Sequence, residues 1–280
     1  MQSSNSTCVR CGQTIQGYYC GNCGEKRLEE KDKSLIHFFE ELVSSIFVAD
    51  GKFLQTIKLL VSNPGELVRS YVMGIRKKYL SPLQVFFFAN LIYFIFPLIS
   101  TFNTNLEIQM YHLPYSAQVR EVVEDYLEGS GLSIDIFKVE FEKTSSSNAK
   151  LLLIVLDLLQ GLFLKLLYLK NKKLFLIDFF AGSAYFYGFY ILIILVLFPA
   201  SLNFISSLFG VDMESLINEL NMTILFLLII FTYMFFILRR GYQTNMIGSI
   251  WRSLLVGIYI VPSFILYRYI LFWVTFWMVK

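Results

Sequence analysis

The four cysteines of the chain form two Cys-x-x-Cys pairs near the N-terminus. The first pair is Cys8 and Cys11, the second is Cys20 and Cys23, and a short segment containing Gly17 separates them. A structural zinc ion takes four tetrahedral ligands, and each Cys-x-x-Cys turn can supply two thiolates. We therefore predict a zinc ribbon over residues 1–27 that holds one structural zinc ion. Four protein ligands leave no open position on the metal, so catalysis by this zinc is not expected.

The partner of the ribbon is predicted from the charges around it. Zinc ribbons contact nucleic acid or protein, and a nucleic-acid surface requires a dense stripe of basic residues with interleaved aromatics. This segment lacks such a stripe and is followed by Glu25, Glu29, Glu30 and Asp32. We expect a protein partner, or the chain's own membrane domain, rather than nucleic acid. Thiolate ligands to zinc suit a reducing cytosol.

Five charged residues fall inside strongly apolar stretches: Asp157, Lys165, Asp178, Arg252 and Arg268. A charge within a bilayer is costly and is a functional-site hypothesis by default. Counted from the ends of their stretches, Asp157 is predicted to pair with Arg268, and Asp178 with Arg252 and Lys165. Two interpretations stay open. The pairs either lock helices together or line a polar path for an ion or a proton.

Catalytic motifs are scarce in this sequence. His37 and His112 are the only histidines, and no nucleophile elbow, phosphate-binding loop or dinucleotide-binding motif occurs. An enzyme is therefore not the favoured interpretation, although a lipid-modifying membrane enzyme stays open as an alternative.

The composition indicates which elements must position these residues. Hydrophobic residues make up 56% of the chain, charged residues make up 16%, and phenylalanine occurs 28 times, as is typical of a membrane protein. A bilayer core requires about 20 apolar residues per helix. Five spans are predicted, near residues 83–101, 151–169, 174–198, 222–238 and 250–278. The last contains Pro262, so it is either one kinked span or a span followed by an interfacial tail.

Charges beside the spans predict the orientation of the membrane domain, residues 82–280. Basic clusters lie in residues 76–78, 170–173 and 239–240, all on one side of an alternating path, and positive charge favours the cytosolic side. Most of the charged residues in the opposite segment, residues 102–149, are acidic. The N-terminus is predicted inside and Lys280 outside. Within 102–149 we expect a short helix after Ser116 and a spacer at residues 145–148.

Residues 28–81 are predicted to form cytosolic amphipathic helices. Apolar residues recur at helical spacing over residues 35–47, Asp50 and Gly51 interrupt the pattern, and a second helix follows. Asn63 and Pro64 supply an N-cap and a first-turn proline for a third helix. The nearby basic residues suit contact with an anionic lipid surface or another anion, although simple anchoring is the alternative. These residues are Arg69, Arg76, Lys77 and Lys78.

A family resemblance rests on the ribbon, on the aromatic first span and on a set of residues between them. From Cys8 to about Phe96 the chain resembles a bacterial family of multi-pass membrane proteins of unknown function with an N-terminal zinc ribbon. The resemblance implies that the protein is located in the bacterial cytoplasmic membrane, and it implies no known activity. Histidines that the family often carries in its third span are missing from residues 178–189. The matching residues are Asp50, Gly51, Lys52, Phe53, Thr56, Asn63, Pro64, Gly65, Glu66, Tyr71, Gly74, Arg76, Tyr79 and Pro82.

Together these features predict an all-α polytopic membrane protein with about five transmembrane helices, preceded by a small four-cysteine zinc ribbon and cytosolic amphipathic helices. The favoured function is a membrane-anchored docking or scaffold protein with the ribbon as its interaction head. A transporter or channel that uses the intramembrane charges is the alternative. The sequence sets no oligomeric state.

Overall fold

The computed structural model describes residues 6–8, 11–15, 17–22, 51–75, 78–96, 102–171, 173–209 and 219–280. The chain divides into two compact units, Met1–Phe53 and Leu54–Lys280. Cys23, Arg76, Lys77 and the helix predicted over residues 35–47 lie outside the described residues.

The first unit contains a small antiparallel hairpin. β1 (Ser6–Thr7) pairs with β2 (Thr14–Ile15). The turn between the strands holds the first cysteine pair, because the Cys8 N–H donates to the Gln13 carbonyl at 2.8 Å and the Gly12 N–H donates to the Cys8 carbonyl at 2.9 Å. Gly12 has a φ of +74°, a left-handed conformation that glycine adopts without steric cost. The sequence thus bends tightly around the first two thiols.

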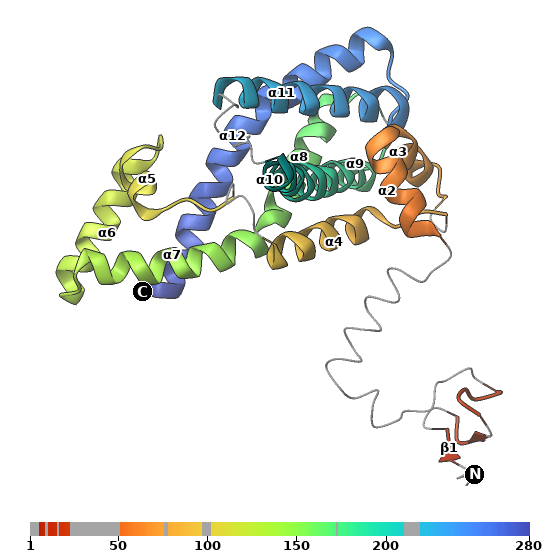
Figure 1. Ribbon diagram of the computed structural model, residues 1–280, viewed down its shortest axis with the longest axis horizontal. Helices are drawn as coiled ribbons and strands as arrows, with labels where there is room; N and C mark the ends of the chain where they lie inside the picture. Colours follow the sequence, from red (N-terminus) through yellow and green to blue (C-terminus); the bar gives the residue numbers. More distant parts are fainter. Residues whose placement is uncertain are drawn as a thin grey trace. The chain divides into compact units, whose positions relative to one another are not determined.

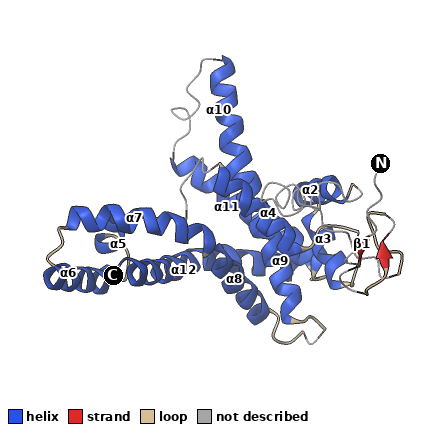
Figure 2. Cartoon of the chain, turned by 90° about the horizontal axis from the view of Figure 1, so that it is seen from below, coloured by secondary structure: helices blue, strands red, loops and turns tan. Residues whose placement is uncertain are grey.

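The described part of the second unit is helical throughout (Figure 1, Figure 2). This agrees with the predicted all-α class. In chain order its elements, with π-helical segments labelled η, are α2 (Lys52–Ser62), α3 (Pro64–Val72), α4 (Pro82–Ile95), α5 (Leu106–Tyr111), α6 (Ser116–Ser130), α7 (Ile134–Leu151), α8 (Leu153–Leu167), α9 (Leu176–Phe189), η2 (Tyr190–Leu197), α10 (Phe198–Phe209), α11 (Glu219–Phe236), η3 (Ile237–Gly241) and α12 (Met246–Val279).

Three helices among the described residues are long and apolar enough to cross a membrane: Leu176–Phe209, Met222–Gly241 and Met246–Val279. They correspond to the last three predicted spans. The other two predicted spans contain shorter helices, since α4 has 14 residues and α8 has 15. Such helices are about 21–23 Å long, less than the roughly 30 Å of a bilayer core. The three long apolar helices indicate a membrane protein. The two shorter helices leave the predicted count of five spans unconfirmed.

Two of the long helices contain a proline. The π-helical segment η2 ends at Leu197, and α10 continues the same long helix from Phe198. Pro199, in the first turn of α10, has no N–H to donate to a helical hydrogen bond. α12 continues through Pro262 as one helix of 34 residues, about 51 Å long. Ser263 Oγ donates to the Ile260 carbonyl at 2.7 Å beside the proline.

Buried tyrosines join the helices of the second unit by donating to backbone carbonyls. The hydroxyl of Tyr185 in α9 donates to the Leu80 carbonyl at 2.7 Å, and that of Tyr233 in α11 donates to the Leu60 carbonyl at 2.9 Å. Tyr267 in α12 donates to the Ala149 carbonyl at 2.7 Å. An unpaired carbonyl in an apolar interior costs about 1–3 kcal/mol, so each hydroxyl stabilises a helix junction.

The amphipathic helix α3 packs closely against η3 at two glycines. A Cβ on Gly65 would meet the Phe236 carbonyl oxygen and would lie 2.6 Å from the Cβ of Arg240. A Cβ on Gly241 would lie 2.8 Å from Cγ1 of Val68. The absence of both side chains lets the two backbones approach. α3 is thus fixed to the end of α11.

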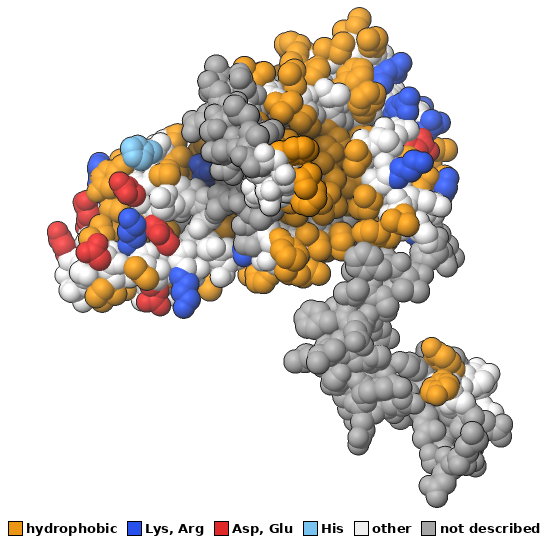
Figure 3. Space-filling view, in the orientation of Figure 1, with side chains coloured by type: hydrophobic (Ala, Val, Ile, Leu, Met, Phe, Trp, Pro, Cys, Tyr) orange, Lys and Arg blue, Asp and Glu red, His pale blue; other side chains and the backbone are white. Residues whose placement is uncertain are grey.

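Residues 102–149 form a helical module with its own core around the end of α12. Phe137 and Phe141 of α7 pack with Phe272 and Phe276 of α12, and α7 and α12 run side by side (Figure 2). The helix predicted after Ser116 is present as α6. Figure 3 shows acidic side chains gathered over this module and a broad hydrophobic surface over other helices of the unit.

The spacer predicted at residues 145–148 is wrong, because α7 continues through it to Leu151. Ser145 Oγ donates to Asn103 Oδ1 at 2.7 Å, and Asn148 Nδ2 donates to Thr275 Oγ1 at 3.2 Å. Contacts with neighbouring elements outweigh the weak helix propensity of serine and asparagine.

Two tyrosines on α12 allow a matched test of the tyrosine bonds. We expect Tyr267→Phe to lower the free energy of unfolding in detergent by about 1–3 kcal/mol, because the buried Ala149 carbonyl loses its donor. Tyr269→Phe should change it little, since that hydroxyl contacts Gln118 at an exposed position. Denaturant titration of both variants would measure the difference. Equal losses in the two variants would contradict the role of the buried bond.

Candidate functional site

Three cysteines of the first unit form a candidate metal centre. The sulfurs of Cys8, Cys11 and Cys20 lie within 4.8 Å of one another, and those of Cys11 and Cys20 are 3.5 Å apart. Cys8 and Cys20 are buried, whereas Cys11 is exposed. Zinc–sulfur bonds of about 2.3 Å in a tetrahedron place sulfurs about 3.8 Å apart. The three thiols therefore fit a metal ion. Cys23, the predicted fourth ligand, lies outside the described residues.

Asp157 and Arg268 line different cavities. Asp157 on α8 is 1% exposed, its Oδ1 has no hydrogen-bond partner, and it borders an apolar cavity of about 260 Å³ with Pro82. Arg268 on α12 borders a cavity of about 420 Å³ together with Glu142 and Asn105. In the described part of the chain no ion pair joins Asp157 to Arg268.

The other predicted pairs lie around the turn between α8 and α9, where they contact backbone groups. Asp178 Oδ2 accepts from the Phe175 N–H at 2.8 Å, and Lys165 Nζ donates to the Leu174 carbonyl at 3.1 Å. Arg252 Nε donates to the Leu167 carbonyl at 3.2 Å. These charges therefore cap helix ends and connecting backbone, and among the described residues they form no ion pairs with one another.

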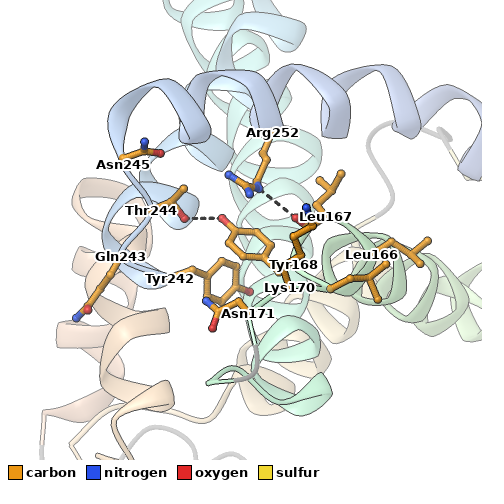
Figure 4. Close-up of a pocket in the computed structure, with 11 residues that line it drawn as sticks. Leu166, Leu167, Tyr168, Lys170, Asn171, Tyr242, Gln243, Thr244, Asn245 and Arg252 are labelled. Carbon is orange, nitrogen blue, oxygen red and sulfur yellow. Dashed lines mark hydrogen bonds between the residues drawn. The ribbon is translucent and has the colours of Figure 1, made fainter.

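A basic cleft of about 630 Å³ lies where α8 ends and α12 begins (Figure 4). It contains two cations, Arg252 and Lys170, and no carboxylate borders it among the described residues. The residues that line this cleft are Leu166, Leu167, Tyr168, Leu169, Lys170, Asn171, Tyr242, Gln243, Thr244, Asn245 and Arg252.

Hydrogen bonds around the basic cleft hold its two connecting loops in place. The Tyr168 hydroxyl and Thr244 Oγ1 are 2.6 Å apart, as the dashed line in Figure 4 shows. The Tyr242 hydroxyl donates to the Asp178 carbonyl at 3.1 Å, and Arg239 Nη1 donates to the Thr244 carbonyl at 2.6 Å.

The predicted lipid or anion contacts lie on exposed surface where the structure describes them. Arg69 is exposed on α3. Lys78 is exposed, with its Nζ 5.1 Å from the centre of the Tyr79 ring. A hydrogen bond with Tyr79 raises the pKa of Lys78. Contact between these residues and lipid stays a prediction.

Sequence reasoning did not identify Tyr168, Thr244 or Asn245 as parts of a site. No spacing pattern connects them, because the cleft arises where two distant loops meet. The available signals were Lys170, which was noted as part of a basic cluster, and Arg252, which was expected to pair with a carboxylate. Only the folded structure shows that Arg252 contacts the Leu167 carbonyl at the end of α8.

The two buried aspartates have different environments and predict opposite effects on stability. We expect Asp157→Asn to raise the unfolding midpoint in detergent, because it removes a carboxylate with an unpartnered oxygen from an apolar interior. Asp178→Ala should lower the free energy of unfolding by about 1 kcal/mol, because the first turn of α9 loses its acceptor. Thermal unfolding of both variants would measure these changes. A lower midpoint for Asp157→Asn would contradict the claim that the Asp157 carboxylate is unpaired and destabilising.

Comparison with known protein families finds a match over part of the chain. Residues 50–94 match a family described as "Protein of unknown function (DUF3667)". No curated protein and no solved structure matches the chain. The matched segment contains α2, α3 and most of α4, which Tyr185 and Tyr233 fasten to α9 and α11. Over this segment the chain is similar to a family of unknown function.

Proposed function

We propose that this chain is a membrane-anchored docking protein whose N-terminal unit is a structural zinc ribbon. The cluster of Cys8, Cys11 and Cys20 carries the proposal, because its three thiols can hold a metal ion and belong to a compact unit of their own, Met1–Phe53. Cys23 is the proposed fourth ligand. When bound, zinc would supply folding energy to a unit too small to bury a core unaided.

The proposed orientation places the ribbon in the cytosol of a bacterial cell and Lys280 outside. Support comes from the basic residues at the ends of the membrane helices, since Lys170 and Lys173 lie between α8 and α9 and Arg239 and Arg240 lie in η3. Such residues favour the cytosolic face of the cytoplasmic membrane. The α5–α7 module, which is mostly acidic, lies on the proposed outer side.

A docking role is preferred over transport because the intramembrane charges do not share a cavity in the described residues. Asp157, Arg268 and Arg252 border three different cavities. A transport path would require polar groups that follow one another through the bundle. Lys165 and Arg252 donate to backbone carbonyls, which supports a structural role for these charges in the body that carries the ribbon.

The metal claim can be tested on the purified full chain. We expect one zinc ion per wild-type chain by elemental analysis, and a loss of at least half of it in Cys8→Ser and Cys20→Ser because a ligand is removed. Thr14→Ser, a change in the same hairpin, should keep the metal. Circular dichroism should show unchanged membrane helices in all variants. Full zinc content in both cysteine variants would contradict the ribbon.

The docking claim has a separate test. Cross-linking in inverted membrane vesicles would compare the wild-type chain with Cys20→Ser, using Thr14→Ser as the matched control. We expect a cross-linked cytosolic protein to be lost only in Cys20→Ser, because its binding surface requires the folded ribbon. Capture of the same protein by all three forms would show that the ribbon is not the interaction head.

A further inference from the structure

We propose that the basic cleft between the end of α8 and the start of α12 binds the anionic headgroup of a membrane lipid. The first observation is its charge. Arg252 and Lys170 border the cleft, and no aspartate or glutamate does so among the described residues. Basic pockets between membrane helices are sites for anionic headgroups. The volume of about 630 Å³ accommodates a phosphate with its glycerol substituents.

Arg252 is held in position with one nitrogen left for a ligand. Its Nε donates to the Leu167 carbonyl at 3.2 Å and its Nη1 donates to the Gly248 carbonyl at 3.3 Å. The guanidinium also lies 4.5 Å from the centre of the Tyr168 ring. Nη2 has no hydrogen-bond partner among the described residues. A fixed guanidinium loses little entropy when it binds a phosphate oxygen.

Two asparagines add neutral donors to the same cleft. Asn171 Oδ1 accepts from the Lys173 N–H at 3.0 Å, and Asn245 Oδ1 accepts from the Gly248 N–H at 3.1 Å. A backbone N–H can donate only to the amide oxygen, so these bonds fix which way each amide points. The amide nitrogens have no partners within the described part of the chain. Both side chains therefore offer donors, as an anion requires.

The surface beside the cleft identifies a lipid rather than a soluble anion. Leu166 and Leu169 at its border are 59% and 66% exposed, and on α12 Ile247 and Trp251 are 79% and 61% exposed. Water-exposed apolar side chains of this size are costly, whereas acyl chains would cover them. Tryptophan is also enriched where membrane helices meet the headgroup region. Cations next to apolar surface match the two parts of an anionic lipid.

Titration of the full chain in detergent tests this assignment. The probes are phosphatidylglycerol, phosphatidylcholine and soluble glycerol phosphate, with bound molecules counted by native mass spectrometry. We expect phosphatidylglycerol to bind at least tenfold more tightly than the other two. Equal binding of phosphatidylcholine would show that headgroup charge is not recognised. Equal binding of glycerol phosphate would show a site for a free anion. Either result overturns the proposal.

Matched variants connect the binding to the cleft. Lys170→Gln should weaken phosphatidylglycerol binding about fivefold, and Arg252→Gln by more than tenfold because a directional donor is lost. Lys143→Gln, at an exposed position in the α5–α7 module, should leave binding unchanged. Lys170 is exposed, so its variant should fold even if Arg252→Gln does not. Unchanged affinity in Lys170→Gln would overturn the proposal.

Discussion

Carbonyl groups at helix ends must find hydrogen-bond donors when those ends lie in apolar surroundings, and the membrane unit depends on how this need is met. Side chains supply the donors here. Tyr233 donates to the carbonyl of Leu60 in the last turn of α2, and Arg252 donates to the carbonyl of Leu167 at the end of α8. Lys165 donates to the carbonyl of Leu174, in the connection between α8 and α9. Each donor belongs to a different segment from its acceptor. The bonds that satisfy helix ends therefore also fasten the helices together.

This arrangement connects the family match with the fold. Residue Leu80, inside the matched segment, has both peptide groups satisfied by side chains, since its N–H donates to Thr56 Oγ1 at 3.0 Å and its carbonyl accepts from Tyr185. The segment 50–94 is thus joined internally and to α9. The same chemistry shapes the basic cleft, where Arg252 is fixed by the Leu167 carbonyl at the end of α8 and by the Gly248 carbonyl of its own helix, and retains one free donor nitrogen. The guanidinium of Arg252 thus has two roles: it makes structural hydrogen bonds, and it takes part in the proposed lipid recognition.

Local patterns predicted the local structure well. Pro64 begins α3 directly after Asn63 as predicted, although the Asn63 side chain makes no capping hydrogen bond. The three thiols that lie together were evident from spacing alone. What the sequence could not indicate is which carbonyls remain without donors after folding. For that reason charge pairs were expected where Lys165 and Arg252 contact backbone, and the polar residues 145–148 were predicted as a spacer although neighbouring elements hold them in a helix.

Hydrogen–deuterium exchange tests most directly whether side-chain donors fasten the matched segment to the bundle. The measurement compares peptides covering α2 and α3 in the wild-type chain, in Tyr185→Phe and in Tyr233→Phe, with peptides of α6 and α7 as the internal reference. If the hydroxyl bonds hold this segment, exchange in α2 and α3 rises in both variants while α6 and α7 stay unchanged. Unchanged exchange in α2 and α3, or an equal rise in every helix, would contradict this role for the tyrosines.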